Sequence, residues 1–304
     1  MKRIGAWIAV LMIGAVNAQA PAQDPAAEMK SAVEAARKTM QAGPADVKLG
    51  DQATLHLPAK YDFIPQAEAV RMLKAMGNRP SNETLGMVVP KAEDQNWFVV
   101  VRYVDSGYIK DDEAKEWNAD ELLQNIREGT AAANEERRNR GMREIEVVGW
   151  VERPAYDAAS HRLVWSMSSR DKGASPGEEQ GINYNTYLLG RHGYVSMNLV
   201  TGLKSVEGQK PMARELLSSL EFDKGKSYAD FNSSTDRIAE YGLAALVGGV
   251  AAKKLGLFAL IAAFAVKFAK VILLGLAGIG TFAYQFFRKK KEAAATTPPQ
   301  APGG

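Results

Sequence analysis

Between residues 53 and 104, apolar residues recur at two different spacings, every second residue in some stretches and every third or fourth residue in another. In "ATLHLPAKYDFI" (53–64), alternate residues are apolar on either side of a proline-containing turn, which predicts two strands. Apolar residues then recur three or four positions apart between Pro65 and Gly77, which predicts a helix. The run "NWFVVVRYV" (96–104) is rich in β-branched and aromatic residues and indicates a buried strand. This part of the chain therefore mixes strands with helices.

A second helix is predicted to begin after Asn118. The Asn118 side chain can cap the helix, and Glu121 three residues later completes a capping box. Apolar residues follow at helical spacing as far as Gly141, which is expected to end the helix.

The segments after this helix have strand character. Four runs, "EIEVVGWVE", "HRLVWSMSS", "INYNTYLLGR" and "GYVSMNLVTG", are separated by Gly, Pro and Asp. Arg191–His192–Gly193 is expected to form a tight turn between the last two, and "PMARELLSSLEF" (211–222) a closing helix. Strands in consecutive runs, rather than alternating with helices, favour an antiparallel sheet. We therefore predict an α+β fold, an antiparallel sheet with packed helices.

The first residues have the pattern of a secretory signal peptide. Two basic residues precede an apolar stretch (4–16) that ends in small residues. We predict a signal peptide over 1–18, cleaved after Ala18; cleavage after Ala20 and an uncleaved anchor are the alternatives. The apolar stretch is shorter than the roughly 20 residues of a membrane span, which favours cleavage.

Residues 19–47 are rich in Ala, Pro, Gln and charged residues. We expect a linker here that contains a short helix around Glu28–Gln41. The exported α+β domain is predicted to follow over 48–230.

An apolar segment near the C-terminus predicts a transmembrane helix. Residues 271–287 carry no charge and are flanked by Lys270 and Arg288. A helix over 267–288 would rise about 31 Å, enough to cross the hydrocarbon core. The basic run that follows marks the cytoplasmic side, and 289–304 are predicted to be a disordered cytoplasmic tail. Together with the signal peptide, this predicts one topology, with the main domain outside the membrane and the C-terminus on the cytoplasmic side.

The stretch 236–266 is predicted to be an amphipathic or membrane-associated helix. Its lysines would share one broad face opposite Ala, Leu and Phe, so it could lie in the membrane interface. It could also enter the membrane as the first arm of a hairpin, although a hairpin would return the C-terminus to the outside. Ser234 or Thr235 can cap a helix that begins near Asp236. We expect this junction to hold the domain in a fixed orientation on the bilayer; a plain spacer is the alternative.

Composition narrows the chemistry further. The 304 residues contain no cysteine, which excludes disulfides, a thiol nucleophile and cysteine-ligated metals. No H-x-x-x-H or G-x-S-x-G motif occurs, so we predict no metal, no cofactor and no serine-hydrolase site. The formal net charge is +3, but the basic excess lies at the two ends and the part between them is mildly acidic. This distribution argues against nucleic-acid binding.

The most acidic stretch surrounds Asp111, Asp112 and Glu113. These acids are contiguous, whereas a calcium loop needs ligands at alternate positions. The plain interpretation is a strand end followed by acids at a helix start, where the helix dipole favours them. A catalytic carboxylate group is the alternative, with Arg191 and His192 as candidate partners.

Several short strings along the chain resemble a known family. They are "GN" (77–78), "LGMVVP" (85–90), "WFVVV" (97–101), "GYIKDDEA" (107–114), "LL" (122–123), "AN" (133–134), "GW" (149–150), "PAYD" (154–157), "LVW" (163–165), "NYN" (183–185), "LGRHG" (189–193) and "YADFNSSTDRIAEYGLAALVGG" (228–249). In this order they resemble domain of unknown function 2167, a family of uncharacterised bacterial membrane-anchored proteins. The resemblance covers about residues 45–287 and implies no reaction, since none is established for the family.

The resemblance implies that "GYIKDDEA" and "YADF…TDRIAEYG" are family signatures, which adds Asp236 to the candidate functional residues. The hairpins followed by a closing helix also look like the α/β/α sandwiches of the PsbP and Mog1 type. This second likeness concerns the fold alone.

A complete membrane anchor without a recognisable catalytic constellation favours a non-enzymatic role. We expect a membrane-anchored periplasmic protein that acts as a binding or scaffold module of the cell envelope. Its expected partners are the lipid bilayer and an envelope protein, and the Gly-rich membrane segment also allows a homo-oligomer. The alternative is an unrecognised envelope enzyme that uses the carboxylates near Asp111–Glu113.

Overall fold

An antiparallel sheet of eight strands forms the centre of the fold, in the order β1-β4-β5-β6-β10-β9-β8-β7. The computed structural model describes residues 25–115, 117–139, 141–175 and 180–248. Strands β7 to β10 form consecutive hairpins, and β6 pairs with β10 to join the two halves of the sheet. The strands are β1 Gln41–Ala42, β4 Tyr61–Pro65, β5 Thr84–Pro90, β6 Phe98–Val104, β7 Ile145–Asp157, β8 Arg162–Asp171, β9 Gly181–Leu189 and β10 Tyr194–Gly202.

A second antiparallel sheet of three strands and five α-helices complete the described part of the chain. The small sheet has the order β11-β3-β2, with β2 Ala45–Leu49, β3 Ala53–Leu57 and β11 Leu220–Phe222. The helices are α1 Pro25–Thr39, α2 Gln66–Ala75, α3 Ala119–Asn139, α4 Val206–Ser218 and α5 Ala245–Gly248. Two short 3-10 turns lie at Asp112–Lys115 and Tyr228–Asp230.

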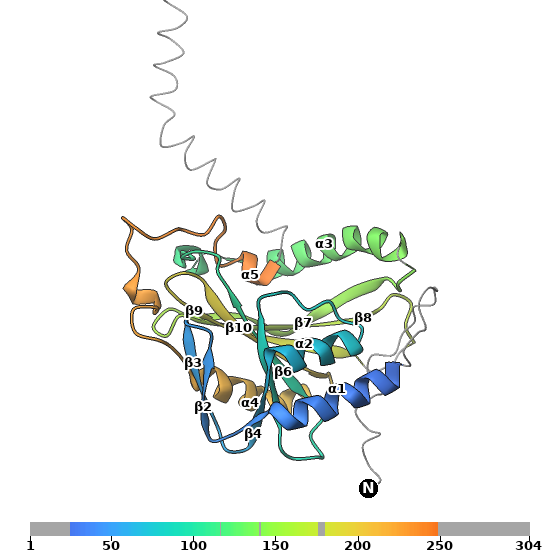
Figure 1. Cartoon of the computed structure of the whole chain (residues 1–304). Coiled ribbons are helices and arrows are strands. Elements are labelled where there is room, and N and C mark those ends of the chain that lie inside the picture. Colours follow the sequence, from blue (N-terminus) through green and yellow to red (C-terminus); the bar gives the residue numbers. More distant parts are fainter. Residues whose placement is uncertain (1–24, 116, 140, 176–179, 249–304) are drawn as a thin grey trace, which may run out of the picture. The chain divides into compact units, whose positions relative to one another are not determined.

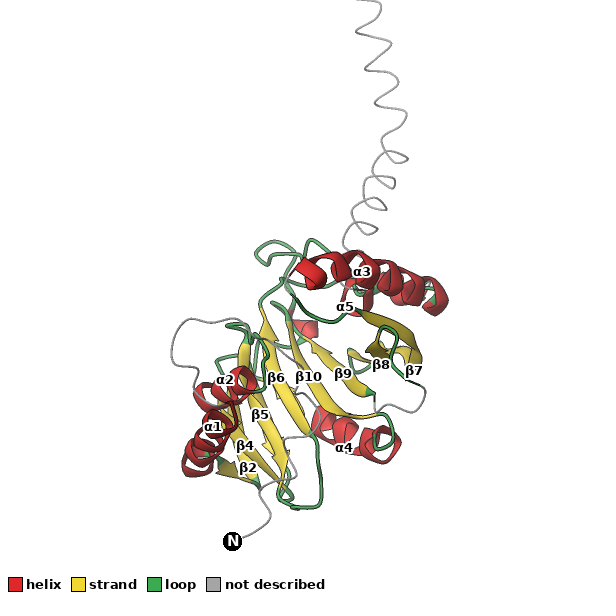
Figure 2. Ribbon diagram, turned by 90° about the vertical axis from the view of Figure 1, so that its right-hand side faces the viewer, coloured by secondary structure: helices red, strands yellow, loops and turns green. Residues whose placement is uncertain are grey.

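Both faces of the large sheet are covered, because alternate residues of each strand point to opposite sides. On one face, side chains such as Val99 and Met197 pack with α4 and the small sheet. The other face has two covers: α1 and α2 over β4 to β6, and α3 with residues 228–247 over β7 to β9. Figure 1 shows α3 and α4 on opposite sides of β7–β10. Figure 2 shows α1 and α2 at the β4–β5 side of the sheet and α3 toward the β7–β9 side.

The α+β class, the antiparallel sheet and the C-terminal hairpins are confirmed. The β9–β10 turn contains Arg191–His192–Gly193 as predicted. Asn118 caps α3, since its Oδ1 accepts hydrogen bonds from the backbone N–H of Asp120 at 2.9 Å and of Glu121 at 3.4 Å. The sequence therefore predicted this part of the fold well, because its signals are local.

Residues 25–47, most of the segment expected to be a linker, belong to the packed domain. The short helix expected around Glu28–Gln41 is α1, and its Ala32 and Ala36 are almost fully buried against α2. Small side chains allow this close approach, and Arg71 of α2 binds Glu28 through two hydrogen bonds of 2.7 and 3.2 Å. Residues 45–49, expected to belong mostly to the linker, form β2.

Two predicted helices have other bounds in the structure. The closing helix begins at Val206 rather than Pro211, and residues 220–222 form β11 instead of its last turn. The helix expected from Asp236 begins only at Ala245, and the described residues before it, 236–244, are not helical. Their backbone groups are used by contacts with other segments, as described below, so they are not free for helical hydrogen bonds.

The predicted signal peptide 1–18, the transmembrane helix 267–288, the tail 289–304 and residues 249–266 lie outside the described residues. Within the described residues, no helix has both the length and the apolar character needed to cross a membrane.

Candidate functional site

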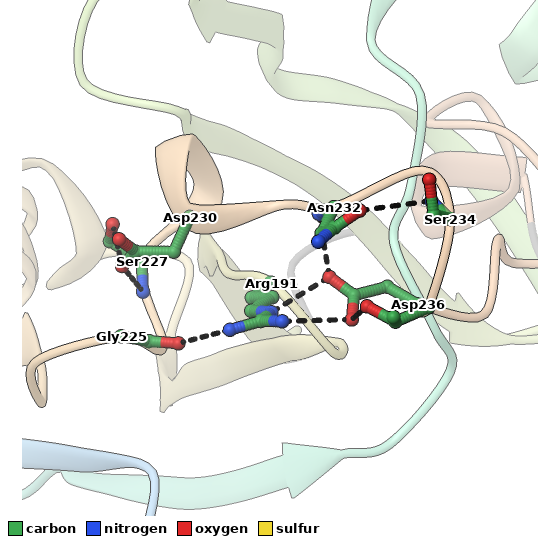
Figure 3. Close-up of polar contacts among 8 residues, drawn as sticks. Arg191, Gly225, Ser227, Asp230, Asn232, Ser234 and Asp236 are labelled. Atoms are coloured by element: carbon green, nitrogen blue, oxygen red, sulfur yellow. Dashed lines mark hydrogen bonds and ion pairs between the residues drawn. The ribbon is translucent and has the colours of Figure 1, made fainter.

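Arg191 and Asp236 form a bidentate ion pair between the β9–β10 turn and the segment that leads to α5 (Figure 3). Arg191 Nε donates to Asp236 Oδ2 at 2.7 Å, and Nη2 donates to Oδ1 at 3.0 Å. Only 4% of the Asp236 side chain is exposed. The guanidinium holds the pKa of Asp236 well below its usual range, so the carboxylate is ionised at any ordinary pH.

The loop around this ion pair is held by its own hydrogen bonds. Asn232 donates its backbone N–H to Asp236 Oδ2 at 2.7 Å, and Ser234 donates its N–H to Asn232 Oδ1 at 3.0 Å. Arg191 Nη1 also reaches the carbonyl oxygen of Gly225 at 3.2 Å, as Figure 3 shows. The buried charges are thus paired and hydrogen-bonded, the arrangement in which burying them is tolerated.

The residues after Asp236 pair with the acidic stretch through the main chain. Tyr108 N–H donates to Arg237 O, and Ala239 N–H donates to Tyr108 O, both at 2.8 Å. Tyr108 and Ile238 therefore form a parallel β-bridge. Gly107 has a φ of 87°, and a Cβ there would lie 2.7 Å from Arg237 O, so the close approach requires glycine. Two strings that are distant in sequence form one backbone unit here.

Two more contacts fasten the same segment to the acidic stretch. Glu113 Oε1 accepts a hydrogen bond from the Ala244 N–H at 2.6 Å, immediately before α5. Arg237 Nη2 donates to Asp105 at its carbonyl oxygen, 2.7 Å away, and at Oδ1, 2.9 Å away. We call residues 225–244 the junction, and these contacts show that it is bound along its length to the domain.

Asp111, Tyr156 and His161 form a hydrogen-bonded group beside the junction. The Tyr156 hydroxyl donates to Asp111 Oδ2 at 2.7 Å, and His161 Nδ1 lies 3.1 Å from that hydroxyl and 3.6 Å from Asp111 Oδ2. Burial, followed by the Asp111 carboxylate, raises the pKa of Tyr156, so its hydroxyl keeps its proton at neutral pH. His161 has a φ of 53°, a left-handed conformation that costs a non-glycine residue about 1 kcal/mol.

Aromatic rings connect this group to the junction. His161 stacks on Tyr228 with ring centroids 4.0 Å apart, Tyr228 stacks on Tyr108 at 4.3 Å, and Tyr108 stacks on Phe231 at 3.8 Å. The Tyr228 hydroxyl donates to the carbonyl oxygen of Ile109 at 2.8 Å. The group around Asp111 and the junction are therefore one packed unit.

The residues that match a known protein family include this whole packed unit. Residues 41–280 match the family described as "Protein of unknown function (DUF2167)", and the match includes every residue of the contacts above. The chain belongs to the DUF2167 family. This confirms the resemblance that the short strings indicate.

Other comparisons add little to the DUF2167 assignment. No curated protein matches the chain. One matching solved structure is the solution structure of cyanobacterial PsbP (CyanoP) from Synechocystis sp. PCC 6803. Its TM-score is 0.34 and its sequence identity 11%, over 61% of this chain and 92% of that chain. At this TM-score we draw nothing from the likeness, and the α+β fold of the DUF2167 chain rests on its own strand pairing.

The candidate residues of the DUF2167 chain do not converge on one catalytic centre. Asp111 contacts Tyr156, Glu113 binds the backbone of the junction, and Arg191 binds Asp236. Asp112 is exposed and makes no hydrogen bond or ion pair with the side chains that the structure describes.

His192 lies apart from this group. Its carbonyl oxygen accepts a hydrogen bond from the Gly107 N–H at 2.9 Å. Its side chain lines a pocket of about 360 Å³ together with Gln52, Tyr103, Asp105 and Arg237. The Arg237 guanidinium in this pocket is already paired with Asp105, so the pocket offers little free charge to a ligand.

Sequence reasoning missed Tyr156 and His161. Tyr156 does occur in the DUF2167 string "PAYD", which is the signal that could have found it. His161 belongs to none of the DUF2167 strings, and its partner Asp111 is far from it in sequence.

The chemistry available at this site is limited. Within the described residues, no group of three His, Asp or Glu side chains could hold a metal ion. Asp111, Tyr156 and His161 are linked by hydrogen bonds, and the Tyr156 hydroxyl is already bound to the Asp111 carboxylate. The site therefore consists of a junction held by structural contacts, with one hydrogen-bonded polar group beside it.

Proposed function

We propose that this DUF2167 protein is an exported binding or scaffold module of the cell envelope, attached to the inner membrane by residues 267–288. Its junction is proposed to fix the orientation of the domain relative to the membrane. The signal-peptide pattern, the apolar segment and the basic run after it support the attachment.

One observation carries the proposal: the segment leading toward the apolar region is not a free spacer. The buried Arg191–Asp236 ion pair and the backbone bridge at Tyr108 bind it to the sheet. A Gly/Ser-type linker would leave the domain free to rotate. Ordering the junction costs conformational entropy, and the contacts of the ion pair and the backbone bridge offset that cost. A fixed orientation is useful to a module that presents one surface to a partner.

The membrane topology can be tested by cysteine labelling, because the natural chain has no cysteine. Glu93→Cys lies in the exposed β5–β6 turn, and Thr297→Cys lies beyond the basic run. A maleimide that cannot cross the inner membrane should label Glu93→Cys in cells with a permeabilised outer membrane, and Thr297→Cys only after lysis. Labelling of both before lysis would show a hairpin, and labelling of neither would show a cytoplasmic domain.

The fixed orientation needs a separate experiment. A flexible Gly/Ser insertion after Ser233 would break the turn that holds Asp236, whereas the same insertion after the exposed Gly173 would not touch the junction. Proteins crosslinked to the full-length chain in intact cells would be compared for both variants. We expect the insertion after Ser233 to lose the crosslinked partners and the control to keep them. Equal crosslinking would show that orientation is not needed.

The polar group around Asp111 supports a second candidate function, an envelope enzyme that uses this carboxylate. The observation in its favour is the close set of Asp111, Tyr156 and His161, with His161 in a strained conformation. Asp111→Asn and Asp112→Asn are a matched pair, because only Asp111 has a partner. A cellular phenotype lost with the first variant alone, while folding and anchoring persist, would favour a catalytic site.

A further inference from the structure

The pocket of about 360 Å³ beside His192 is built from four separate segments. They are the β2–β3 turn, the end of β6 with the loop after it, the β9–β10 turn and the junction. The residues that line it are Gln52, Tyr103, Asp105, Gly107, His192 and Arg237. The pocket is partly open to solvent, and its volume lies within the range of about 300–1,000 Å³ that is usual for small-molecule sites. A small ligand can therefore enter it.

Backbone contacts hold the walls of this pocket in place. The Gly107 N–H donates to the His192 carbonyl oxygen at 2.9 Å, which binds the loop after β6 to the β9–β10 turn. The Gln52 carbonyl oxygen accepts a hydrogen bond from the Asp223 N–H at 2.9 Å, which fixes the β2–β3 turn beside β11. The junction is bound to the same loop, as described above. A preformed pocket favours binding, because little conformational entropy is lost when a ligand enters it.

Several polar atoms in the pocket have no partner among the residues that the structure describes. The Tyr103 hydroxyl and the His192 imidazole make no hydrogen bond to them. Gln52 uses its Nε2 on Asp51 at 2.7 Å and leaves its Oε1 unused. Burial raises the pKa of Tyr103 to about 12, so its hydroxyl keeps its proton at neutral pH and can donate. The free groups therefore include both donors and acceptors of hydrogen bonds.

The charges in the pocket favour a neutral ligand. Asp105 and Arg237 carry opposite charges and are bound to each other at 2.9 Å. An anion would have to displace Asp105 from the guanidinium, and a cation would have to displace Arg237 from the carboxylate. The Tyr103 and His192 side chains offer ring surfaces, but the lining is too polar to suit an apolar molecule.

A sugar combines the properties that this lining requires. Each of its hydroxyl groups can donate and accept a hydrogen bond, so neighbouring hydroxyls match the mixed donors and acceptors of Tyr103, His192 and Gln52. Its ring also presents C–H groups, which can pack against an aromatic ring whose polar end remains hydrogen-bonded. It carries no charge that would disturb the Asp105–Arg237 pair.

We propose that this pocket binds a neutral sugar unit through Tyr103, His192, Gln52 and the Asp105–Arg237 pair. A free sugar and one unit of a longer glycan share this chemistry, and the probes below distinguish them. Because Arg237 belongs to the junction, the bound sugar contacts the segment that leads toward the apolar region. The inference names a ligand class for the binding role proposed above and rests on that role, but it does not depend on membrane attachment.

The test measures binding by saturation-transfer NMR on the full-length protein, in a detergent without a sugar headgroup. The probes are glucose, galactose, N-acetylglucosamine and the linear trisaccharide of N-acetylglucosamine. We expect a saturable signal from at least one probe, with the same affinity at low and high ionic strength because the ligand is neutral. A trisaccharide that binds about tenfold or more tightly than its monosaccharide identifies a glycan as the ligand, and similar affinities identify a free sugar.

A pair of tyrosine variants connects the binding to the pocket. Tyr103→Phe removes one hydroxyl and should weaken binding about fivefold, the usual loss for one hydrogen bond. It should unfold at the same temperature as the natural protein, because the hydroxyl has no described partner to lose. Tyr184→Phe is the matched control, since it removes a strand tyrosine hydroxyl that is bound to Glu152 and does not line the pocket. It should bind sugar as the natural protein does.

A pair of histidine variants tests a second wall of the pocket. His192→Ala should weaken binding by at least the same factor as Tyr103→Phe. His56→Ala is its control, because His56 lies on β3, binds Asp46 and does not line the pocket. It should leave the affinity unchanged.

Three results would overturn the proposal. They are no saturable signal from any probe, unchanged affinity in both Tyr103→Phe and His192→Ala, and displacement of the bound sugar by inorganic phosphate, which would show an anion site at Arg237. Cysteine labelling and crosslinking are read separately, so failure of sugar binding can be told apart from failure of the predicted attachment and orientation.

Discussion

Asp236 is almost fully buried, and the described residues offer it one cationic partner, Arg191. We predict that Asp236→Asn lowers the thermal unfolding midpoint and releases the junction, because Arg191 then keeps a half-buried charge without a counter-ion. Hydrogen exchange at the Ala239 amide, which is bonded to Tyr108, should accelerate on the order of tenfold or more. Asp112→Asn serves as the control, and an equal effect of both variants would contradict a special role for Asp236.

The same ion pair predicts a pH dependence. Because the pKa of Asp236 is lower in the folded than in the unfolded state, its stabilisation is fully present above the unfolded-state value of about 4. It is lost as the pH falls from there toward the folded-state pKa. The difference in unfolding midpoint between the natural protein and Asp236→Asn should therefore be constant from pH 7 to about pH 5 and shrink below about pH 4. A difference that shrinks near neutral pH would point to a histidine instead.

Tyr156 gives a further prediction at the residue scale. Tyr156→Phe removes one hydrogen bond to the half-buried Asp111 and should cost about 1–2 kcal/mol in the free energy of unfolding. Denaturant unfolding measures this value. Asp112→Asn should change it by less than about 0.5 kcal/mol, as for other surface substitutions.

At the scale of elements, two tryptophans anchor different layers. Trp97, immediately before β6, is 1% exposed and packs edge-on against Tyr61, whereas Trp150 of β7 is only partly buried. Trp150 donates its Nε1–H to the Ala119 carbonyl at 3.0 Å and so links β7 to the first turn of α3.

Because the two tryptophans have different environments, we expect their replacement by alanine to lower the free energy of unfolding by different amounts. Trp97→Ala should destabilise the fold by about 3–5 kcal/mol, the usual range for a fully buried aromatic residue. Trp150→Ala should cost less globally, but it should increase hydrogen exchange in α3 specifically. Equal global losses without any local effect in α3 would contradict this assignment.

At the scale of the whole molecule, the helix α1 is part of the folded domain and contributes to its stability. A chain that starts at residue 41 lacks α1 and uncovers the apolar side chains of α2 and β4 that pack with it. We expect it to lose about 2–3 kcal/mol from apolar burial alone, relative to a chain that starts at residue 24. Chemical denaturation of both chains measures the difference. Equal stability would mean that α1 is only an appendage, as the composition of residues 19–47 suggests.

Much of the fold follows from the sequence alone. The period-two runs determined the consecutive hairpins β7 to β10, and the Asn118 cap determined the start of α3, because these signals act between residues close in the chain. The strand β5 was missed, because its "LGMVVP" is a short apolar run without a period. The closing helix was predicted to continue through residue 222, but residues 220–222 pair with β3 as β11 and the helix ends before them.

The candidate site depends on contacts that no local pattern encodes. Asp236 and Arg191 were both named from the sequence, but only the fold brings one beside the other. Residues 236–244 have the composition of a helix start, yet the backbone of Tyr108 and the Glu113 carboxylate take hydrogen-bonding groups that a helix would use. The sequence by itself determined which residues favour strands, helices and turns, since those preferences are local. Tertiary structure decided which charges are buried and paired, as Asp236 is with Arg191, because pairing depends on which distant segments the fold brings together.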